Sequence, residues 1–216
     1  MNKSDVISQI TETGVIPVIR AASADEARRA IDAIKAGGIV IFEITMTVPG
    51  AVRLIEKLAA SYGAEALIGA GTVLDAATAR DCIDAGAQFI ISPALNLDTI
   101  LFCNQAETVV MPGALTPTEI VTAWNAGADF VKVFPAGALG GASYLKSLKA
   151  PLPHIKLIPT GGVSLQTAAD FIKAGASAVG VGADLVDLEA LRNNQDDLIA
   201  EKAREYLEIV RNARQK

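Results

Sequence analysis

The stretch Ala126-Gly127-Ala128-Asp129-Phe130-Val131-Lys132-Val133-Phe134 leads from the end of a helical pattern directly into a short β-branched run. Glycine suits the left-handed position just after a helix, so the Ala-Gly-Ala triplet marks a helix end before a strand. Similar triplets stand at residues 36–38, 85–87 and 174–176, and the four are spaced by 49, 41 and 48 residues. This repeat predicts a chain built from successive helix and strand units.

The same alternation continues on both sides of this stretch. We expect strands at Val15–Arg20, Ile39–Thr45, Ala66–Thr72, Gln88–Pro93, Thr108–Met111, Asp129–Phe134, Ile155–Thr160 and Ala178–Gly182. We expect helices at Ser23–Ala36, Pro49–Tyr62, Asp75–Ala85, Leu97–Gln105, Thr116–Ala126, Ala142–Leu148, Ser164–Ala174 and Gln195–Ala213. The residues Ser23, Asp75, Thr116 and Ser164 are good N-caps for four of these helices.

Eight strand–helix units predict an α/β fold, and within it a single (β/α)8 TIM barrel that spans residues 1–216 as one domain. The alternative is a doubly wound open sheet. A Gly-x-Gly-x-x-Gly motif after the first strand would favour that sheet, and the sequence has none there. In a barrel of this type, function gathers at the carboxyl ends of the strands.

The composition narrows the classes of function. A net charge of −5, with 19 basic residues scattered among 24 acidic ones, argues against nucleic-acid binding. Cys82 and Cys103 give neither a disulfide framework nor metal-ligand spacing, and a single histidine, His154, does not build a zinc site. We expect no metal and no cofactor. Residues 1–14 lack the apolar run of a signal peptide and no stretch is long enough to span a membrane, so we expect a cytoplasmic protein with no membrane partner.

Lys132 is the strongest chemical signal. Strand alternation places it on one face with Phe130 and Phe134 and places the two valines on the other face. If the valines pack against helices, Lys132 points into the barrel, loses hydration and becomes available as a neutral, nucleophilic amine. The alternative is a core lysine in a structural ion pair.

Glu43 is the second signal. The run from Ile39 to Thr45 places Ile41, Glu43 and Thr45 on one face, so the carboxylate also points inward. A buried lysine and a buried glutamate compensate each other's charge, and the carboxylate is suited to proton transfer. A purely structural pair is the alternative.

Glycines close the last two strands. Gly161 and Gly162 follow strand seven and Gly182 ends strand eight, where glycine loops make a site for an anion such as phosphate or carboxylate. Glycines also mark tight barrel turns, which is the other interpretation. Arg20 ends strand one and is placed either to hold a substrate carboxylate or to form an exposed salt bridge.

Seven sequence blocks, in this order, resemble the family of 2-keto-3-deoxy-6-phosphogluconate (KDPG) aldolases, also described as 4-hydroxy-2-oxoglutarate (KHG) aldolases. The resemblance covers nearly the whole chain. The blocks are Gly14-Val15-Ile16-Pro17-Val18-Ile19-Arg20, Glu43-Ile44-Thr45, Gly69-Ala70-Gly71-Thr72-Val73, Ile91-Ser92-Pro93, Met111-Pro112-Gly113, Lys132-Val133-Phe134-Pro135 and Pro159-Thr160-Gly161-Gly162-Val163.

The resemblance implies a class I aldolase, in which Lys132 forms a Schiff base with a 2-oxo acid and Glu43 acts as acid and base. It implies that Thr72 helps to hold the pyruvate carboxylate, that Thr160 lies near the pyruvyl group and that Pro93 belongs to the substrate site. The substrate is then KDPG, 4-hydroxy-2-oxoglutarate or both.

The resemblance further implies that Gly161 and Gly162 form a phosphate loop, with Gly182 and Ala183 beside them. It implies a homotrimer that needs no metal. Two positions depart from many members of the family. Thr47 stands in the substrate site where they carry an arginine for the substrate carboxylate, and we expect Arg20 to take over that anion. Ala183 stands where they carry a serine, so backbone N–H groups would hold phosphate more weakly.

Other functions remain open. Within the same chemistry, the galactonate-derived epimer of KDPG is an alternative substrate. A phosphosugar isomerase barrel would use the same anion site with Glu43 as base and would need no lysine nucleophile. A third alternative is a non-catalytic protein that binds 2-oxo acids.

Overall fold

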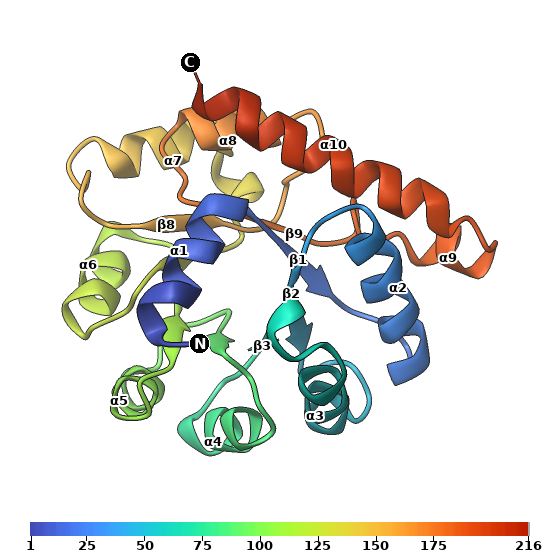
Figure 1. Cartoon of the computed structure of the whole chain (residues 1–216). Helices are drawn as coiled ribbons and strands as arrows, with labels where there is room; N and C mark the ends of the chain where they lie inside the picture. Colours follow the sequence, from blue (N-terminus) through green and yellow to red (C-terminus); the bar gives the residue numbers. More distant parts are fainter. Residues whose placement is uncertain (216) are drawn as a thin grey trace.

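The computed structural model describes residues 1–215, and strands alternate with helices along them (Figure 1). The strands are β1 (Val15–Ile19), β2 (Ile41–Thr45), β3 (Leu67–Gly71), β4 (Phe89–Ile91), β5 (Val109–Met111), β6 (Gly113–Ala114), β7 (Val131–Val133), β8 (Leu157–Pro159) and β9 (Val179–Val181). The α-helices are α1 (Lys3–Thr13), α2 (Ala24–Ala36), α3 (Ala51–Tyr62), α4 (Ala76–Asp84), α5 (Leu97–Gln105), α6 (Pro117–Asn125), α7 (Ala142–Lys149), α8 (Ala168–Lys173), α9 (Leu188–Arg192) and α10 (Asp196–Arg214). Short 3-10 turns lie at Gly63–Glu65 and Gly137–Leu139.

Every strand pairing given by the described residues is parallel, as the alternation predicts. Six strands form one curled sheet in the order β5-β4-β3-β2-β1-β9, and β6, β7 and β8 form a second. Two contacts bridge β8 to β9: Ser177 N donates to Leu157 O at 2.9 Å, and Thr160 pairs with Gly180. At the other end, Asp129 N donates to Val110 O at 3.1 Å. The parallel α/β arrangement is therefore confirmed.

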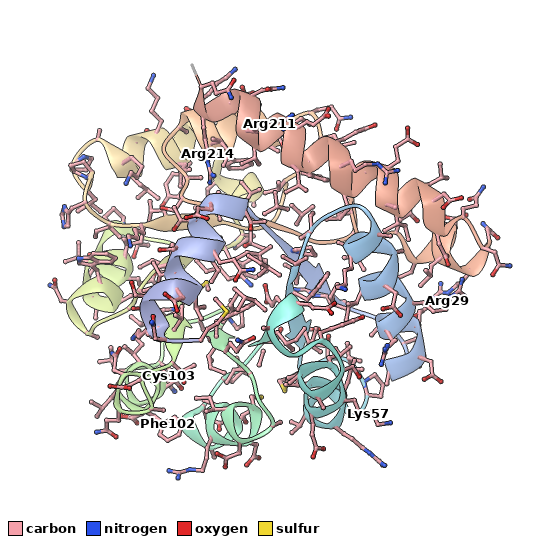
Figure 2. The ribbon with its side chains drawn as sticks, viewed as in Figure 1. Arg29, Lys57, Phe102, Cys103, Arg211 and Arg214 are labelled. Carbon is pink, nitrogen blue, oxygen red and sulfur yellow. The ribbon has the colours of Figure 1, made fainter. Side chains whose placement is uncertain are left out.

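Two apolar layers follow from the alternation of side chains along each strand. The larger layer packs the outward faces of the strands against the helices, which surround the strands in Figure 1. The smaller layer lies on the inner faces of the curled sheets, and Figure 2 shows side chains on this side of the strands. Its strand residues are Ile16, Ile41, Leu67, Phe89, Ile91, Val109, Met111, Phe130, Ile158 and Ala178.

Helix α1 was not expected from the sequence, because it offers only a narrow apolar stripe. Val6 and Ile10, one turn apart, are buried in the inner layer, and the Asn2 side chain caps the helix by accepting from Asp5 N at 2.9 Å. The helix precedes β1 and lies across the strands in Figure 1. It therefore covers the inner layer from the amino ends of the strands and leaves the carboxyl ends open.

Other expected boundaries were wrong in detail. The strand expected at Thr108–Met111 continues past Pro112 as β6. Proline has no backbone N–H to donate, so it interrupts the hydrogen bonds of the strand, but the chain stays extended. The helix expected from Ser164 begins only at Ala168, because Thr167 Oγ1 accepts from Ser164 N and donates to Gly162 O, which holds a turn there. The caps at Ser23, Asp75 and Thr116 are confirmed.

Candidate active site

Lys132 and Glu43 meet on the inner face of the strands. Nζ of Lys132 donates to Oε1 of Glu43 at 3.3 Å, and the two side chains are 4% and 2% exposed. Lys132 lies on β7 beside Ile158 of β8, and Glu43 lies on β2 beside Val18 of β1. The pairing expected from strand alternation is confirmed, as a contact between residues 89 positions apart in the chain.

An aromatic ring borders the amine. Nζ of Lys132 lies 5.5 Å from the ring centroid of Phe134, which follows on the same strand face. The Glu43 carboxylate also contacts Nζ, so the amine has one proton acceptor and one weakly polar ring beside it. This surrounding can hold the amine in one orientation and can move a single proton between the two groups.

A chain of hydroxyl groups lies next to Glu43, one step nearer the carboxyl end of β2. Oγ1 of Thr45 donates to Ile19 O at 2.9 Å and lies 2.7 Å from Oγ1 of Thr47. Because Thr45 has one hydroxyl hydrogen and gives it to a carbonyl, Thr47 must be the donor between the two threonines. Thr47 is exposed and keeps only lone pairs for a further partner.

A glycine-rich pocket of about 280 Å³ opens at the carboxyl ends of β1, β8 and β9. Six of the expected site residues line it: Arg20, Thr160, Gly161, Gly162, Gly182 and Ala183. Phe134 also lines the pocket, so the pocket extends to the aromatic ring that borders Lys132. We call this cavity the glycine-rich pocket.

Charges and donors in the glycine-rich pocket suit an anion. Arg20 is exposed and makes no ion pair within residues 1–215, while Asp184, which also lines the pocket, accepts a hydrogen bond from the Tyr206 hydroxyl. Gly161 and Gly162 have φ of 85° and 77°, a left-handed backbone that favours glycine. A Cβ at Gly162 would lie 2.7 Å from Gly137 Cα, so this loop also packs too closely for a side chain.

Of the expected residues outside the lining of this pocket, Thr72 and Pro93 follow β3 and β4. Thr72 is half-buried directly after β3 and has φ of 59°, which is unusual for a β-branched residue and marks local strain. Pro93 is half-buried after β4, and its carbonyl lies where a Cβ of Gly113 would be. Gly113 pairs with Lys132 between β6 and β7, so Pro93 packs on the strand face that carries the amine.

Sequence reasoning missed the roles of Thr45 and Asp184 in the architecture of the site. Thr45 carried a usable signal, since it follows Glu43 by two residues and shares its face. Asp184 carried no such signal in the sequence, because the position of its side chain in the pocket depends on the turn after β9. Among residues 1–215, no three histidine, cysteine or acidic side chains gather as ligands for a metal ion. Nor does any helix in that range have the length and apolar character needed to cross a membrane.

Comparison with known proteins now decides the family. A family model described as KDPG and KHG aldolase matches residues 6–202. The chain belongs to the KDPG and KHG aldolase family. The resemblance seen in the sequence blocks is therefore confirmed.

Relatives within the family differ in substrate. The KHG/KDPG aldolase of Escherichia coli K12 is 32% identical over 206 residues, which cover 95% of this chain and 96% of that protein. The 2-dehydro-3-deoxy-6-phosphogalactonate aldolase of the same organism is 36% identical over 176 residues, or 81% and 85% of the two chains.

Solved structures agree with this fold. One is the KDPG aldolase of Legionella pneumophila with pyruvate captured as a covalent carbinolamine intermediate, which has a TM-score of 0.84 and 31% identity over 92% of this chain and 96% of that one. Another is a protein cage designed by fusing symmetric oligomeric domains, with a TM-score of 0.83 and 32% identity over 94% of this chain and 73% of that one.

Proposed function

We propose that this chain is a class I aldolase that cleaves KDPG to pyruvate and glyceraldehyde 3-phosphate, 4-hydroxy-2-oxoglutarate to pyruvate and glyoxylate, or both. The observation that carries the proposal is the buried contact of 3.3 Å between Lys132 and Glu43. Family membership and the carbinolamine captured in the Legionella enzyme support a covalent route through an amine.

The proposed reaction begins with a proton transfer inside the pair. Transfer from the Lys132 ammonium to Glu43 leaves a neutral amine, which attacks the C2 carbonyl of the 2-oxo acid. Glu43 then returns the proton to the C2 hydroxyl, which leaves as water and gives an iminium ion. The dry, enclosed position of both groups strengthens each of these electrostatic steps.

Cleavage follows from the electron demand of the iminium. Glu43 takes the proton of the C4 hydroxyl, the C3–C4 bond breaks, and its electron pair forms an enamine at C3 while the aldehyde departs. The proton then returns to C3, and water hydrolyses the iminium to release pyruvate and the free amine. One carboxylate therefore serves as base and acid in turn.

The remaining residues divide between the two ends of the substrate. We assign Thr72, Pro93 and Thr160 to the pyruvyl end, near the pair. We assign Arg20 and the backbone of the glycine-rich pocket, including Gly161, Gly162, Gly182 and Ala183, to the distal anion. Thr47 is exposed just after β2, where its lone pairs can accept from a substrate hydroxyl but cannot hold a carboxylate.

The architecture proposed for this site is a single closed (β/α)8 barrel in one domain. The hydrogen bonds that bridge β8 to β9 and the β5 side to β7 support closure, and β5 with β6 would count as one strand. We also propose a homotrimer. The use of a 32% identical domain as a symmetric oligomeric unit in the cage supports oligomerisation.

Borohydride trapping tests the mechanism. With pyruvate and borohydride, the active protein should gain one reduced pyruvyl group on Lys132, located by peptide mass spectrometry. Lys132→Arg keeps the positive charge but removes the nucleophile, so it should abolish trapping and cleavage. A barrel isomerase that needs only the charge would keep turnover in Lys132→Arg, and a binding protein would show no turnover at all.

The galactonate-derived epimer is the second candidate substrate, because the phosphogalactonate aldolase of E. coli is 36% identical to this chain. A panel of KDPG, its galactonate-derived epimer and 4-hydroxy-2-oxoglutarate, coupled to pyruvate release, decides among them. We expect the phosphorylated pair to exceed 4-hydroxy-2-oxoglutarate in kcat/KM, because a phosphate offers more charge and more acceptor oxygens to Arg20 and the glycine-rich pocket than a carboxylate does.

A further inference from the structure

A second cavity, of about 320 Å³, lies beside the glycine-rich pocket. The two cavities share four lining residues: Val18, Arg20, Gly182 and Ala183. The rest of the second lining comes from the segment that enters α9, at Val186, Asp187 and Leu188. We call this second cavity the side pocket.

Small residues stand between the two cavities. A Cβ built on Gly182 would find no heavy atom within 4 Å, and its neighbour Ala183 carries only an exposed methyl group. Gly182 and Ala183 therefore place no bulky side chain between the side pocket and the glycine-rich pocket, and Val18 and Arg20 are the other two residues that the cavities share. Phe134 borders the Lys132 amine and lines the glycine-rich pocket, which shares these four residues with the side pocket.

The lining of the side pocket consists mainly of aliphatic and small residues, with Arg20 as its one cation. Val18, Val186 and Leu188 present aliphatic surface. The one acid, Asp187, is already occupied, because it accepts from Ala190 N at 3.0 Å and from Lys202 Nζ at 3.1 Å, and these contacts, the backbone bond first, hold the pKa of its carboxyl below its usual value. Such a surface stabilises a hydrocarbon chain by removing it from water.

We propose that the side pocket binds the uncharged aliphatic tail of a 4-hydroxy-2-oxo acid, or of the aldehyde that such an acid releases. The proposal rests on the proposed aldolase function and adds a second substrate class to it. The volume lies at the lower end of the range of small-molecule sites, which suits a short chain. Phosphorylated tails use the glycine-rich pocket and apolar tails use the side pocket.

The corresponding reaction in the addition direction balances without an oxidant or reductant. The enamine of pyruvate on Lys132 attacks the aldehyde carbon through C3 and forms the new C–C bond. The resulting alkoxide takes a proton from Glu43, and water hydrolyses the iminium to release a 4-hydroxy-2-oxo acid with the aliphatic tail.

A chain-length series tests the proposal. Pyruvate is combined with unbranched aldehydes from ethanal to hexanal, and kcat/KM should rise about fourfold per methylene until the side pocket is filled. Glyceraldehyde 3-phosphate is the reference aldehyde, because it depends on the glycine-rich pocket. A kcat/KM that does not rise with chain length would overturn the proposal.

A filled pocket provides the matched variant. Leu188→Trp should abolish the dependence on chain length and leave addition to glyceraldehyde 3-phosphate unchanged. Leu198→Trp, at a position that is 46% exposed on α10, adds the same bulk outside the pocket and should change neither. A chain-length dependence that survives Leu188→Trp also overturns the proposal. Borohydride trapping with pyruvate is measured on each variant, so a failure of the aldolase chemistry is distinguished from a failure of the side pocket.

Discussion

A Cβ atom at Gly71 would lie 2.1 Å from Oε1 of Glu43, well inside the contact distance of two heavy atoms. Gly71 is the end of β3, the strand next to Glu43, and its φ is not in the left-handed region. The glycine is therefore required for space and not for backbone conformation. The absence of a side chain at Gly71 leaves the space that the Glu43 carboxylate occupies when it contacts Lys132.

The first prediction follows from this contact. Gly71→Ala should displace the Glu43 carboxylate and lower kcat about 100-fold or more, as expected for loss of a general acid–base group. The same overpacking should lower the free energy of unfolding by about 1–3 kcal/mol. Steady-state kinetics and urea unfolding measure the two effects.

A double-mutant cycle separates a clash with Glu43 from general damage. In a Glu43→Gln background, Gly71→Ala should change kcat little further, because the function of the carboxylate is already lost. Additive losses of kcat would show that Gly71 acts elsewhere.

The second prediction concerns Arg20, the cation that we propose binds the substrate anion. Arg20 lines both cavities and has no acidic partner within residues 1–215, so Arg20→Ala should raise the KM for KDPG by roughly 10–100-fold with a smaller change in kcat. Thr47→Arg in that variant should recover part of the affinity if both positions serve the same anion. Unchanged KM in Arg20→Ala would exclude this role for Arg20.

The period-two alternation of strands explains what the sequence could predict. Lys132 and Glu43 each stand in an apolar run, and alternation alone turned both side chains to the interior, where they meet. The Gly161–Gly162 pair likewise indicated a tight turn, and a Cβ at Gly162 would lie 2.7 Å from Gly137 Cα. Such local rules apply because each strand is buried on both faces and leaves few choices of register.

What the sequence could not predict depends on contacts between distant segments. The buried face of helix α1 consists only of Val6 and Ile10. The position of the helix depends on the inner apolar layer, to which eight segments along the rest of the chain contribute. The direction of the Thr47–Thr45 hydrogen bond depends on Ile19 O, which belongs to another strand. The side pocket exists because the turn after β9 and α9 leave space beside Arg20.

The third prediction is a loss of stability in alkali. Burial raises the pKa of Cys82 to about 11 and that of Cys103, on α5 in Figure 2, to about 12. An unfolded thiol ionises near pH 8.5, so above that pH the unfolded chain binds fewer protons than the folded one and the free energy of unfolding falls. Urea unfolding should show this loss between pH 8 and pH 10.5.

The thiol variants provide the control for this prediction. Cys82→Ala with Cys103→Ala should flatten the decline but not remove it, because burial also raises the pKa of Tyr62 to about 12. An equal slope in the variant and the parent would rule out the thiols as the cause. Below pH 8 both proteins should show the same dependence on pH.

The fourth prediction concerns the amino-end closure of the barrel-like core. The Arg214 guanidinium, near the end of α10, donates to Glu12 O at 2.8 Å and to Ser177 O at 2.9 Å. It thereby ties α10 to the end of α1 and to the segment before β9. A Cβ at Gly14 would lie 2.5 Å from Nη2 of Arg214, so the arginine packs directly over the glycine turn between α1 and β1.

Arg214→Ala should lower the free energy of unfolding by about 1–2 kcal/mol, since it removes two charged hydrogen bonds that lie at the exposed surface. Arg211, one turn earlier on α10 in Figure 2, is exposed and makes no hydrogen bond or ion pair within residues 1–215, so Arg211→Ala should change stability by less than about 0.5 kcal/mol. Because Arg214 lies at the opposite end of the strands from Lys132, kcat at 25 °C should stay unchanged in both variants. An equal loss of stability in the two would show that the two carbonyl contacts contribute nothing beyond an ordinary surface arginine.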